Sequence, residues 1–452
     1  MLIESISGIR GTVGDSLTPV EVVDYAAAFG QWVKKGNIVI GRDSRVSGRA
    51  IADIFARTLQ WMGLNVIDIG IVPTPTVQLL TEKMQAQGGV VITASHNPFP
   101  WNGIKYIDKT GLFLDAAQVA QVLENKKHRQ WTFKPAGEFG GYRDEDNAIV
   151  EHVKNVLEIP YIDIEKIRSR RFKVVIDAVN GGGSLALPVL LRALGCRVIE
   201  INCTPDGYFP HTPEPLPENL GDMLKKIKEH KADLGMAVDP DADRLAVADE
   251  KGNYLSEEYT LVMAVDTVLS QCKINHPKVV TNLSTTQAVT DIAEKYGAEI
   301  IRTAIGEINV AKKMKAVSAV IGGEGNGGII SPDSHLGRDS LVGAAMVLNF
   351  LASDPRPLSK KYADLPRYKM SKKKIEIGGS DPDAILAGLK AAYAKEDTDA
   401  TDGLKIIRKD RWVHIRKSNT EPILRVYSEA PTSEAAEALG DEYIDAIKKM
   451  ME

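Results

Sequence analysis

The chain has 452 residues, 44% of them hydrophobic and 26% charged, with a formal net charge of −4 at pH 7. This length exceeds one ordinary hydrophobic core, so it predicts three or four domains of a globular protein. The small negative charge excludes a general attraction to nucleic acid or to an anionic membrane, and no apolar run approaches the length of a membrane-spanning helix.

The beginning of the chain and its cysteines lead us to expect a cytoplasmic protein. Residues 1–5 show no basic segment leading into an apolar one, so we expect no signal peptide. Cys196, Cys203 and Cys272 are an odd number without a C-x-x-C pair, which is typical of reduced thiols. A metal site built on these cysteines is therefore not expected.

The first segment combines a glycine-flanked arginine with a helix. Arg10 lies in SGIRGT, residues 7–12, which suits a tight loop that holds the guanidinium, although an ordinary turn beside an edge strand has the same pattern. Thr18 and Pro19 are typical of an N-cap and a first helical residue, so we predict a helix over residues 19–34.

A strand–helix–strand pattern then occurs three times. Each copy has an apolar strand, an amphipathic helix, a glycine at the helix end and a second strand, which predicts a βαβ unit with a parallel crossover. The first strands are residues 37–43, 173–178 and 278–282, and the second strands are residues 63–70, 195–201 and 297–302. This spacing is too long for a solenoid and predicts three related α/β domains.

The segment GGVVITASHNP, residues 88–98, runs from a short apolar strand into a polar loop. Ser95 therefore lies just beyond the carboxyl end of a strand, where α/β sheets place their ligands. A hydrolase nucleophile would need G-x-S-x-G, which these neighbours do not provide. A serine that only caps a turn remains the alternative.

Three aspartates follow the apolar run at residues 234–238, in the segment DPDADR. They are Asp239, Asp241 and Asp243. Their i, i+2, i+4 spacing places three carboxylates on one side of an extended segment, and their repulsion favours a bound cation such as Mg²⁺. An EF-hand loop would need glycine where Arg244 stands, whereas a solvated acidic turn remains possible.

Two further polar loops suit a sugar phosphate. In GGEGNGG, residues 322–328, the glycines allow the backbone to approach a ligand closely. Glu324 and Asn326 can form hydrogen bonds with vicinal sugar hydroxyls. A plain turn or a dinucleotide-binding loop is the alternative. The segment RKSNTEP, residues 416–422, joins Arg425 in a phosphate cup, unless it is an exposed basic turn.

The end of the chain has a different organisation. A lysine-rich hinge or linker is expected over residues 359–374. No βαβ pattern follows it, so we expect an α+β domain. Its predicted elements are a helix at 382–394, strands within 405–415 and at 424–428, and a last helix at 434–451; earlier, a helix is expected at 144–157.

Together, TASHNP, DPDADR, the glutamate-containing glycine loop and the arginine-rich loop resemble, in order, the motifs of the α-D-phosphohexomutases: phosphoglucomutases, phosphomannomutases and phosphoglucosamine mutases. The resemblance covers the whole chain. It implies three α/β domains with mixed sheets and a C-terminal α+β domain. The expected limits are residues 1–150 (phosphoserine loop), 151–253 (metal loop), 254–365 (sugar-binding loop) and 366–452 (phosphate-binding loop).

The resemblance also implies roles for individual residues. Ser95 would carry a phosphoryl group whose oxygen joins Asp239, Asp241 and Asp243 around Mg²⁺. Catalysis would further involve His96, Arg10 and Lys105, the last in the matching segment NGIK. The substrate-binding residues would be Arg244, Gly306, Glu307, Glu324 and Asn326. The phosphate that does not react would be held by Arg416, Ser418, Asn419, Thr420 and Arg425.

Two departures from the family pattern bear on the sugar. The family usually has Glu-x-Ser, often followed by Gly-His, where this chain has Asn326 and Gly328, and it usually has His or Asp in place of Glu307. The variant GEGNGG looks like the archaeal-type branch of phosphoglucosamine mutases, and a carboxylate at position 307 suits an ammonium group.

The implied activity is the interconversion of hexose 6-phosphate and hexose 1-phosphate through phosphoserine and a hexose 1,6-bisphosphate, which also serves as activator. We favour glucosamine phosphate over a phosphomannomutase or phosphoglucomutase. A non-catalytic sugar-phosphate-binding paralogue and a metal-dependent phosphatase remain alternatives from other classes. The expected partner is a small sugar phosphate, with no nucleic acid or membrane, and the expected assembly is a monomer or homodimer.

Overall fold

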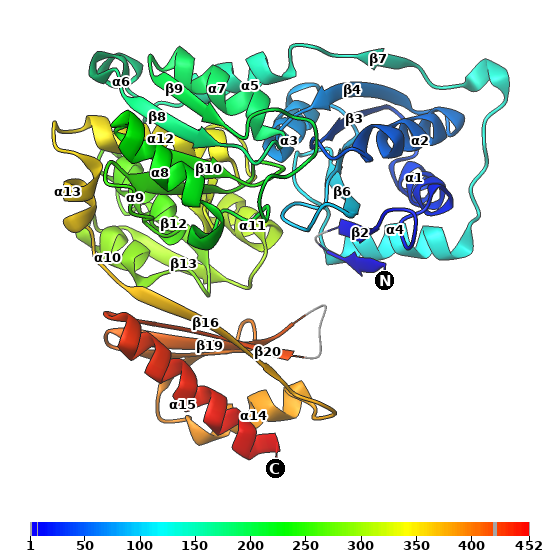
Figure 1. Ribbon diagram of the computed structural model, residues 1–452. Coiled ribbons are helices and arrows are strands. Elements are labelled where there is room, and N and C mark those ends of the chain that lie inside the picture. The colour runs from blue at the N-terminus through cyan, green and yellow to red at the C-terminus, as the bar shows by residue number, and fades with distance from the viewer. Residues whose placement is uncertain (1, 7, 419–422, 452) are drawn as a thin grey trace.

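The computed structural model describes residues 2–6, 8–418 and 423–451 and folds them into four units, each with its own β-sheet (Figure 1). The first unit is blue to cyan, the second and third are green to yellow, and the fourth, orange to red, lies beneath the third. In these ranges no helix has both the length and the apolar character needed to cross a lipid bilayer.

The first unit is built on a seven-stranded mixed sheet in the order β1-β2-β6-β5-β3-β4-β7. Its strands are β1 (Ile3–Ser5), β2 (Gly8–Thr12), β3 (Asn37–Arg42), β4 (Asn65–Ile71), β5 (Gly88–Ile92), β6 (Trp101–Asp108) and β7 (Tyr142–Asp144). Its helices are α1 (Pro19–Val33), α2 (Gly48–Trp61), α3 (Thr74–Lys83) and α4 (Ala116–His128). Strand β5 lies in the middle of this sheet, and each of its residues is buried. The serine loop, which follows β5, therefore begins at the centre of the sheet.

The second and third units each have a four-stranded sheet, in the orders β11-β10-β8-β9 and β13-β12-β14-β15. The second contains β8 (Lys173–Asp177), β9 (Arg197–Ile201), β10 (Leu234–Val238), β11 (Leu245–Asp249), α6 (Ile164–Arg170), α7 (Gly183–Ala193) and α8 (Gly221–His230). The third contains β12 (Lys278–Asn282), β13 (Glu299–Thr303), β14 (Ile321–Glu324), β15 (Gly328–Ile330), α9 (Glu258–Leu269), α10 (Gln287–Lys295), α11 (Glu307–Val317), α12 (Ser340–Ala352) and α13 (Leu358–Ala363). One antiparallel edge strand in each sheet makes it mixed.

All three predicted βαβ units are confirmed. β3 with β4, β8 with β9, and β12 with β13 are parallel pairs. The glycine predicted after each crossover helix has a positive φ: 81° at Gly63, 76° at Gly195 and 67° at Gly297. Glycine adopts this conformation without the steric cost that a side chain would add, which is why it stands at the helix end.

Helix α12 joins the second and third units in one hydrophobic core. All of its residues are buried, and its apolar side chains cluster with those of α9 in its own unit and of α7 in the second. Helix α5 (Ala148–Leu157) adds Val153 and Val156 to the same cluster. A helix that is apolar on all sides requires such complete burial. The two units therefore pack around one shared helix.

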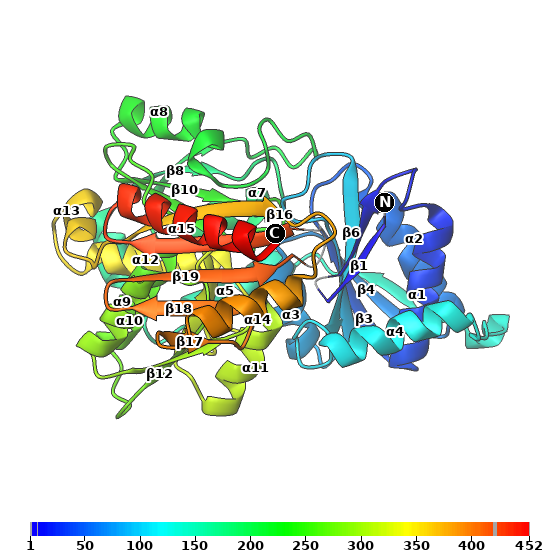
Figure 2. The same ribbon diagram turned by 90° about the horizontal axis from the view of Figure 1, so that it is seen from below.

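The fourth unit is an antiparallel sheet in the order β16-β20-β19-β18-β17, packed against two helices, and Figure 2 shows it from below. Its elements are β16 (Lys369–Glu376), β17 (Asp397–Asp399), β18 (Leu404–Arg408), β19 (Arg411–Lys417), β20 (Ile423–Ala430), α14 (Pro382–Ala392) and α15 (Ser433–Met451). The predicted fold class, three α/β units and a C-terminal α+β unit, is confirmed.

Three local predictions were wrong. Most of the expected linker at 359–374 is folded, because α13 covers its start and the lysines from Lys369 onward belong to the edge strand β16. The helix expected from residue 144 begins at Ala148, after a short strand that extends the first sheet. The glycine stretch from Gly322 to Glu324 belongs to β14, since glycines fit where neighbouring backbone and side chains leave no room for a Cβ.

Candidate active site

The serine loop is held in one conformation by a buried ion pair. Thr93 Oγ1 accepts from Ser95 N at 2.9 Å and donates to Asp43 Oδ2 at 2.6 Å. Asp43 pairs at 3.1 Å with Arg45, whose guanidinium donates to the carbonyl oxygens of Ser95 and Asn97, both at 2.6 Å. Ser95 itself has φ of +50°, which is uncommon for a residue with a side chain. The loop is thus fixed by contacts that the sequence analysis did not identify.

Ser95 faces the aspartate loop of the second unit. Its Oγ donates to Asp239 Oδ2 at 3.2 Å, and it lies 3.4 Å from His96 Nδ1. Arg244, then burial, then Arg10 lower the pKa of His96 to about 2. His96 is therefore neutral at physiological pH, because the positive charges of the two arginines disfavour a third one on the imidazole.

The three aspartates form a compact, fully buried group at the turn between β10 and β11. One carboxylate oxygen of each lies within 4.8 Å of the others. Burial, with the charges of Asp243 and Asp241, raises the pKa of Asp239 well above its usual range. Asp241 Oδ1 and Asp243 Oδ1 are buried and have no hydrogen-bond partner among the described residues. Hard anionic oxygens with open positions and mutual repulsion fit a small divalent cation.

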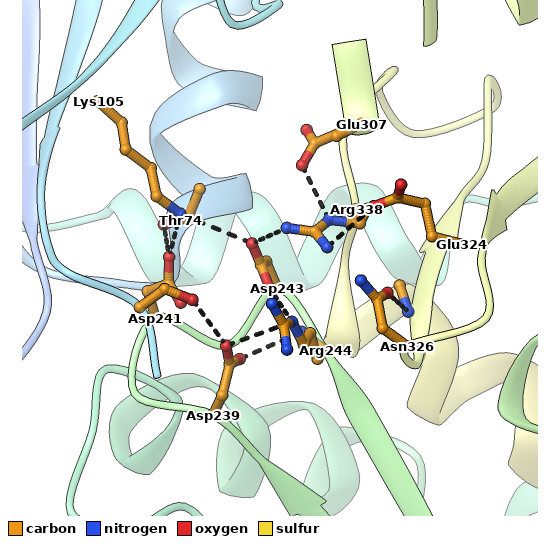
Figure 3. Close-up of polar contacts among 12 residues, drawn as sticks. Thr74, Lys105, Asp239, Asp241, Asp243, Arg244, Glu307, Glu324, Asn326 and Arg338 are labelled. Carbon is orange, nitrogen blue, oxygen red and sulfur yellow. Dashed lines mark hydrogen bonds and ion pairs between the residues drawn. The ribbon is translucent and has the colours of Figure 1, made fainter. Parts of the chain in front are cut away.

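Lys105 connects the first unit to this group (Figure 3). From β6, its Nζ donates to Asp241 Oδ2 at 2.7 Å and lies 3.7 Å from Asp243 Oδ2. Thr74 Oγ1 donates to the same oxygen of Asp241 at 2.8 Å. Burial alone would raise the pKa of Asp241, but Lys105 outweighs it and lowers that pKa below the usual range. The group combines carboxylates with a cation before any metal binds.

Arg338 lies between the aspartate loop and the sugar-side carboxylates, as the dashed lines in Figure 3 show. Its guanidinium donates to Asp243 Oδ2 at 2.6 Å, to Glu307 Oε2 at 3.0 Å and to Glu324 Oε2 at 3.1 Å. The sequence analysis missed this residue. The sequence offers only a general signal: Asp339 is the N-cap of a helix that is apolar apart from Ser340 and Asn349, so its charged neighbour needs a partner, but nothing local says which one.

Both predicted sugar-side glutamates are buried and hydrogen-bonded. Glu307 is the first residue of α11 and also accepts from Gln78 Nε2 at 3.0 Å. Glu324 accepts at Oε1 from Asn282 Nδ2 at 2.8 Å and from Gly306 N at 2.9 Å. Burial raises the pKa of Glu307; at Glu324 the same effect is outweighed by Arg338 and the hydrogen bonds, so that its pKa is lowered.

The other predicted residues lie at the border of this group. Arg244 N donates to Asp239 Oδ1 at 3.2 Å, and its Nη1 lies 3.5 Å from Glu214 Oε1. Arg10 Nη1 donates to Asn97 Oδ1 at 2.9 Å and so supports the serine loop. Asn326 Oδ1 accepts from Gly328 N at 3.2 Å, within its own turn.

The predicted phosphate-binding arginines face each other across two strands. Arg416 on β19 and Arg425 on β20 are register partners, so their side chains leave the same face of the sheet. Ser418 N donates to Ile423 O at 3.1 Å at the end of this hairpin, and Asn419 and Thr420 lie outside the described residues. Two arginines on one face of neighbouring strands are a combination that can bind a dianion.

The fourth unit also contacts the loop before Glu307. Asp402 Oδ2 accepts from Ile305 N at 2.9 Å, next to Gly306. His414 on β19 lies with Nδ1 2.8 Å from Ser284 Oγ and with Nε2 2.6 Å from Asp402 O. The sheet that holds Arg416 and Arg425 is thus joined directly to the third unit.

Family models match almost the whole chain. They are described as phosphoglucomutase/phosphomannomutase, alpha/beta/alpha domains I, II and III and C-terminal domain, and they match residues 3–132, 150–252, 256–368 and 369–446. A phosphoglucomutase/phosphomannomutase of Thermococcus kodakarensis is 39% identical over 98% of this chain and 97% of its own. A phosphoglucosamine/phosphogalactosamine mutase of Sulfurisphaera tokodaii is 34% identical over 98% of both chains.

Solved structures have the same fold. A phosphoglucomutase/phosphomannomutase family protein of Burkholderia thailandensis superposes with a TM-score of 0.87 at 26% identity, covering 100% of this chain and 98% of its own. The N-acetylphosphoglucosamine mutase of Aspergillus fumigatus, solved in complex with GlcNAc-6P and magnesium, has a TM-score of 0.58 at 16% identity, covering 99% and 96%. At that identity the likeness concerns the fold alone.

Proposed function

The chain belongs to the phosphoglucomutase/phosphomannomutase family and is a phosphohexomutase, and we propose that it interconverts glucosamine 6-phosphate and glucosamine 1-phosphate. The observation that carries the mechanism is the 3.2 Å contact between Ser95 Oγ and Asp239, at the edge of a carboxylate group with open oxygens. This contact supports the proposal, because it brings a hydroxyl that could carry a phosphoryl group next to carboxylates that suit a cation.

In the proposed mechanism, the four units supply one part each. We assign these parts to domains at residues 1–150, 151–253, 254–365 and 366–452. Ser95 carries the phosphoryl group, and Asp239, Asp241 and Asp243 would hold Mg²⁺. When bound, the dication neutralises charge on the group being transferred. Phosphoryl transfer then depends chiefly on positioning and electrostatics, which a rigid, buried site provides.

In this proposal the surrounding residues orient the sugar phosphate. The bond from phosphorus to Ser95 Oγ breaks as a bond to a sugar oxygen forms, which yields the 1,6-bisphosphate, the intermediate and activator. Lys105 and Arg244 neutralise charge beside the carboxylates, and Arg10 and His96 keep the serine loop and its hydroxyl in place. The bisphosphate then reorients, and its other phosphate returns to Ser95. Arg416 and Arg425, with Ser418, Asn419 and Thr420, hold the phosphate that is not reacting.

The preference for glucosamine rests on charge. On the sugar side, the guanidinium of Arg338 faces two carboxylates, Glu307 and Glu324, so this part of the site keeps an excess of negative charge that favours an ammonium group. Relatives named as phosphoglucosamine mutases support this choice. We further propose a cytoplasmic enzyme that acts on its sugar phosphate as a monomer or homodimer.

Comparison of three substrates tests the proposed sugar. With a bisphosphate activator present, kcat/KM is expected to be higher for glucosamine 6-phosphate than for glucose 1-phosphate or mannose 1-phosphate. Glu307→Gln keeps the size and one acceptor oxygen but removes the charge, so it should reduce the advantage of glucosamine by about 10-fold and spare glucose. A wild-type preference of more than about 10-fold for either hexose 1-phosphate would overturn the choice.

The phosphate-binding arginines provide another test. Arg416→Ala and Arg425→Ala are each expected to raise the KM for the sugar phosphate by about 10-fold, because each removes a charge-assisted contact, while phospho-Ser95 still forms. Lys417→Ala is the matched control, since that neighbouring lysine is exposed and pairs with Asp383 at 2.9 Å. Steady-state kinetics and intact mass spectrometry provide the measurements. Unchanged KM in both arginine variants would refute the assignment.

A further inference from the structure

Arg338 connects three elements that the mechanism uses separately. Asp243 comes from the turn after β10, Glu307 opens α11, and Glu324 ends β14, yet one guanidinium donates to all three at 2.6–3.1 Å. The side chain of Arg338 is only 10% exposed. A buried cation among three carboxylates restricts each of them to the rotamer that keeps its hydrogen bond.

The position of the Arg338 side chain depends on the absence of a Cβ at Gly328. A Cβ added to Gly328 would overlap Arg338 Cδ and lie 2.8 Å from its Cγ. Gly328 does not have a left-handed φ, so space rather than backbone conformation excludes other residues there. Position 328 is also where this sequence departs from the family pattern, which often has histidine. The glycine and the arginine thus complement each other sterically.

The backbone beside Arg338 is firmly anchored. Asp339 N donates to Ile329 O of β15 at 2.9 Å, and Asp339 Oδ1 accepts from Leu341 N at 2.8 Å as the cap of α12. Asp339 Oδ2 lies 2.7 Å from His152 Nε2 and 3.1 Å from His335 Nε2, and all three residues are buried. With the following residue fixed to a strand, a helix and two histidines, Arg338 has little freedom to turn towards solvent.

We propose that Arg338 is a positioning residue that orients Glu324 and Glu307 towards the sugar ring and fixes both relative to the metal-binding loop, in the space left by Gly328. This inference rests on the proposed role of Glu324 as the group that bonds to the 3- and 4-hydroxyls. Without Arg338, two buried carboxylates would lose their shared cation and turn to other partners.

The test compares the natural substrate with analogues that lack one hydroxyl. The substrate is whichever hexose phosphate the wild type turns over best, so the test does not depend on glucosamine. For the wild type, the 3-deoxy and 4-deoxy analogues should lower kcat/KM by about 10- to 100-fold, because each removes a charge-assisted hydrogen bond between the sugar and Glu324. For Arg338→Met the same deletions should change kcat/KM by less than about 3-fold, since a misplaced Glu324 no longer contacts the hydroxyls.

Two more variants separate position from charge. Gly328→Ala changes no charge but displaces Arg338, so it should reproduce the loss of hydroxyl discrimination seen in Arg338→Met. Arg338→Lys keeps the charge without the planar three-way contact and should restore only part of the discrimination. In all three, the loss with the natural substrate should appear mainly in KM, and intact mass should still show phospho-Ser95.

Matched controls identify effects that are only structural. Gly343→Ala adds a Cβ that would lie 3.1 Å from Ile329 Cδ1, the flexible end of a side chain, and should behave as the wild type. Arg302→Met removes a half-buried arginine that donates to the carbonyl oxygens of Asn282 and Thr285; it should lower stability and leave hydroxyl discrimination intact.

Three results would overturn the inference: wild-type discrimination retained in Arg338→Met and Gly328→Ala, its loss in Arg302→Met as well, or a wild type indifferent to both deoxy analogues. If Arg338→Met does not fold, Gly328→Ala and Arg338→Lys decide the matter, since both keep the positive charge. Failure of the proposed function would appear differently, as a wild type without mutase turnover on any hexose phosphate.

Discussion

Ser95→Ala is expected to lower mutase turnover by at least about 10³-fold, the loss typical of removing a nucleophile from a concerted site. The change removes Oγ together with its 3.2 Å hydrogen bond to Asp239 and its 3.4 Å contact with His96 Nδ1. The contacts that shape the loop use the backbone of residue 95, including its carbonyl oxygen bonded to Arg45, so the variant should keep its fold. The loss should therefore appear in kcat rather than in thermal stability.

Intact mass spectrometry connects this loss to the proposed chemistry. The wild type, incubated with a hexose 1,6-bisphosphate, should gain one phosphate, and Ser95→Ala should gain none. Ser184→Ala is a suitable control, because Ser184 Oγ is buried without a hydrogen-bond partner among the described residues. Normal turnover in Ser95→Ala, or phosphate gained elsewhere in that variant, would rule out Ser95 as the carrier.

Removal of the metal is expected to abolish activity, and Asp241→Asn to lower it by about 10²- to 10³-fold, since one hard anionic ligand becomes neutral. The structure makes Asp241 the sensitive position. Its Oδ2 binds Lys105 and Thr74, whereas its Oδ1 has no hydrogen-bond partner within the described ranges and is open to a cation. The substitution also takes from Lys105 its closest carboxylate.

Two measurements check the metal. EDTA should stop turnover and Mg²⁺ restore it. Mg²⁺ should also raise the melting temperature of the wild type, because a ligand that binds only the folded state stabilises it, and should do so much less for Asp241→Asn. Asp249→Asn is the control: Asp249 is a buried carboxylate at the far end of the same hairpin and accepts from Lys251 N at 2.9 Å. Full activity after exhaustive chelation would exclude a metal-dependent mechanism.

Some features of this protein follow from local sequence alone. Unbroken apolar runs such as Val90–Val91–Ile92 need burial on both sides, so the parallel strands and their crossovers could be predicted without any long-range information. The aspartate loop could also be predicted locally. Its three carboxylates are each only two residues from the next, so they repel each other wherever the loop lies in the fold. Ser95 and Lys105 could be identified because each belongs to a short motif, TASHNP or NGIK, that resembles a family pattern.

Other features depend on segments far apart in the chain. Arg338 meets Asp243 across 95 residues and Glu307 across 31, and no motif around it indicates that contact. Arg45 shapes the serine loop from 50 residues away. Glu307, whose carboxylate was expected to suit an ammonium group, is buried against Gln78, 229 residues away, a contact that no local pattern predicts. The shared core around α12 and the pairing of β16 with β20 likewise depend on segments that are far apart in the chain.

There is a physical reason why some features follow from local sequence and others only from the tertiary structure. A hydrophobic period, a cap or a cluster of like charges acts within a few residues, so its consequence can be derived from the sequence alone. The partner of a buried charge is instead selected by how whole units pack, because a buried guanidinium must find carboxylates among whatever side chains the fold brings within about 3 Å. The chemistry of the site is thus encoded in short motifs, and its precise orientation, through Arg45 and Arg338, arises only when the units assemble.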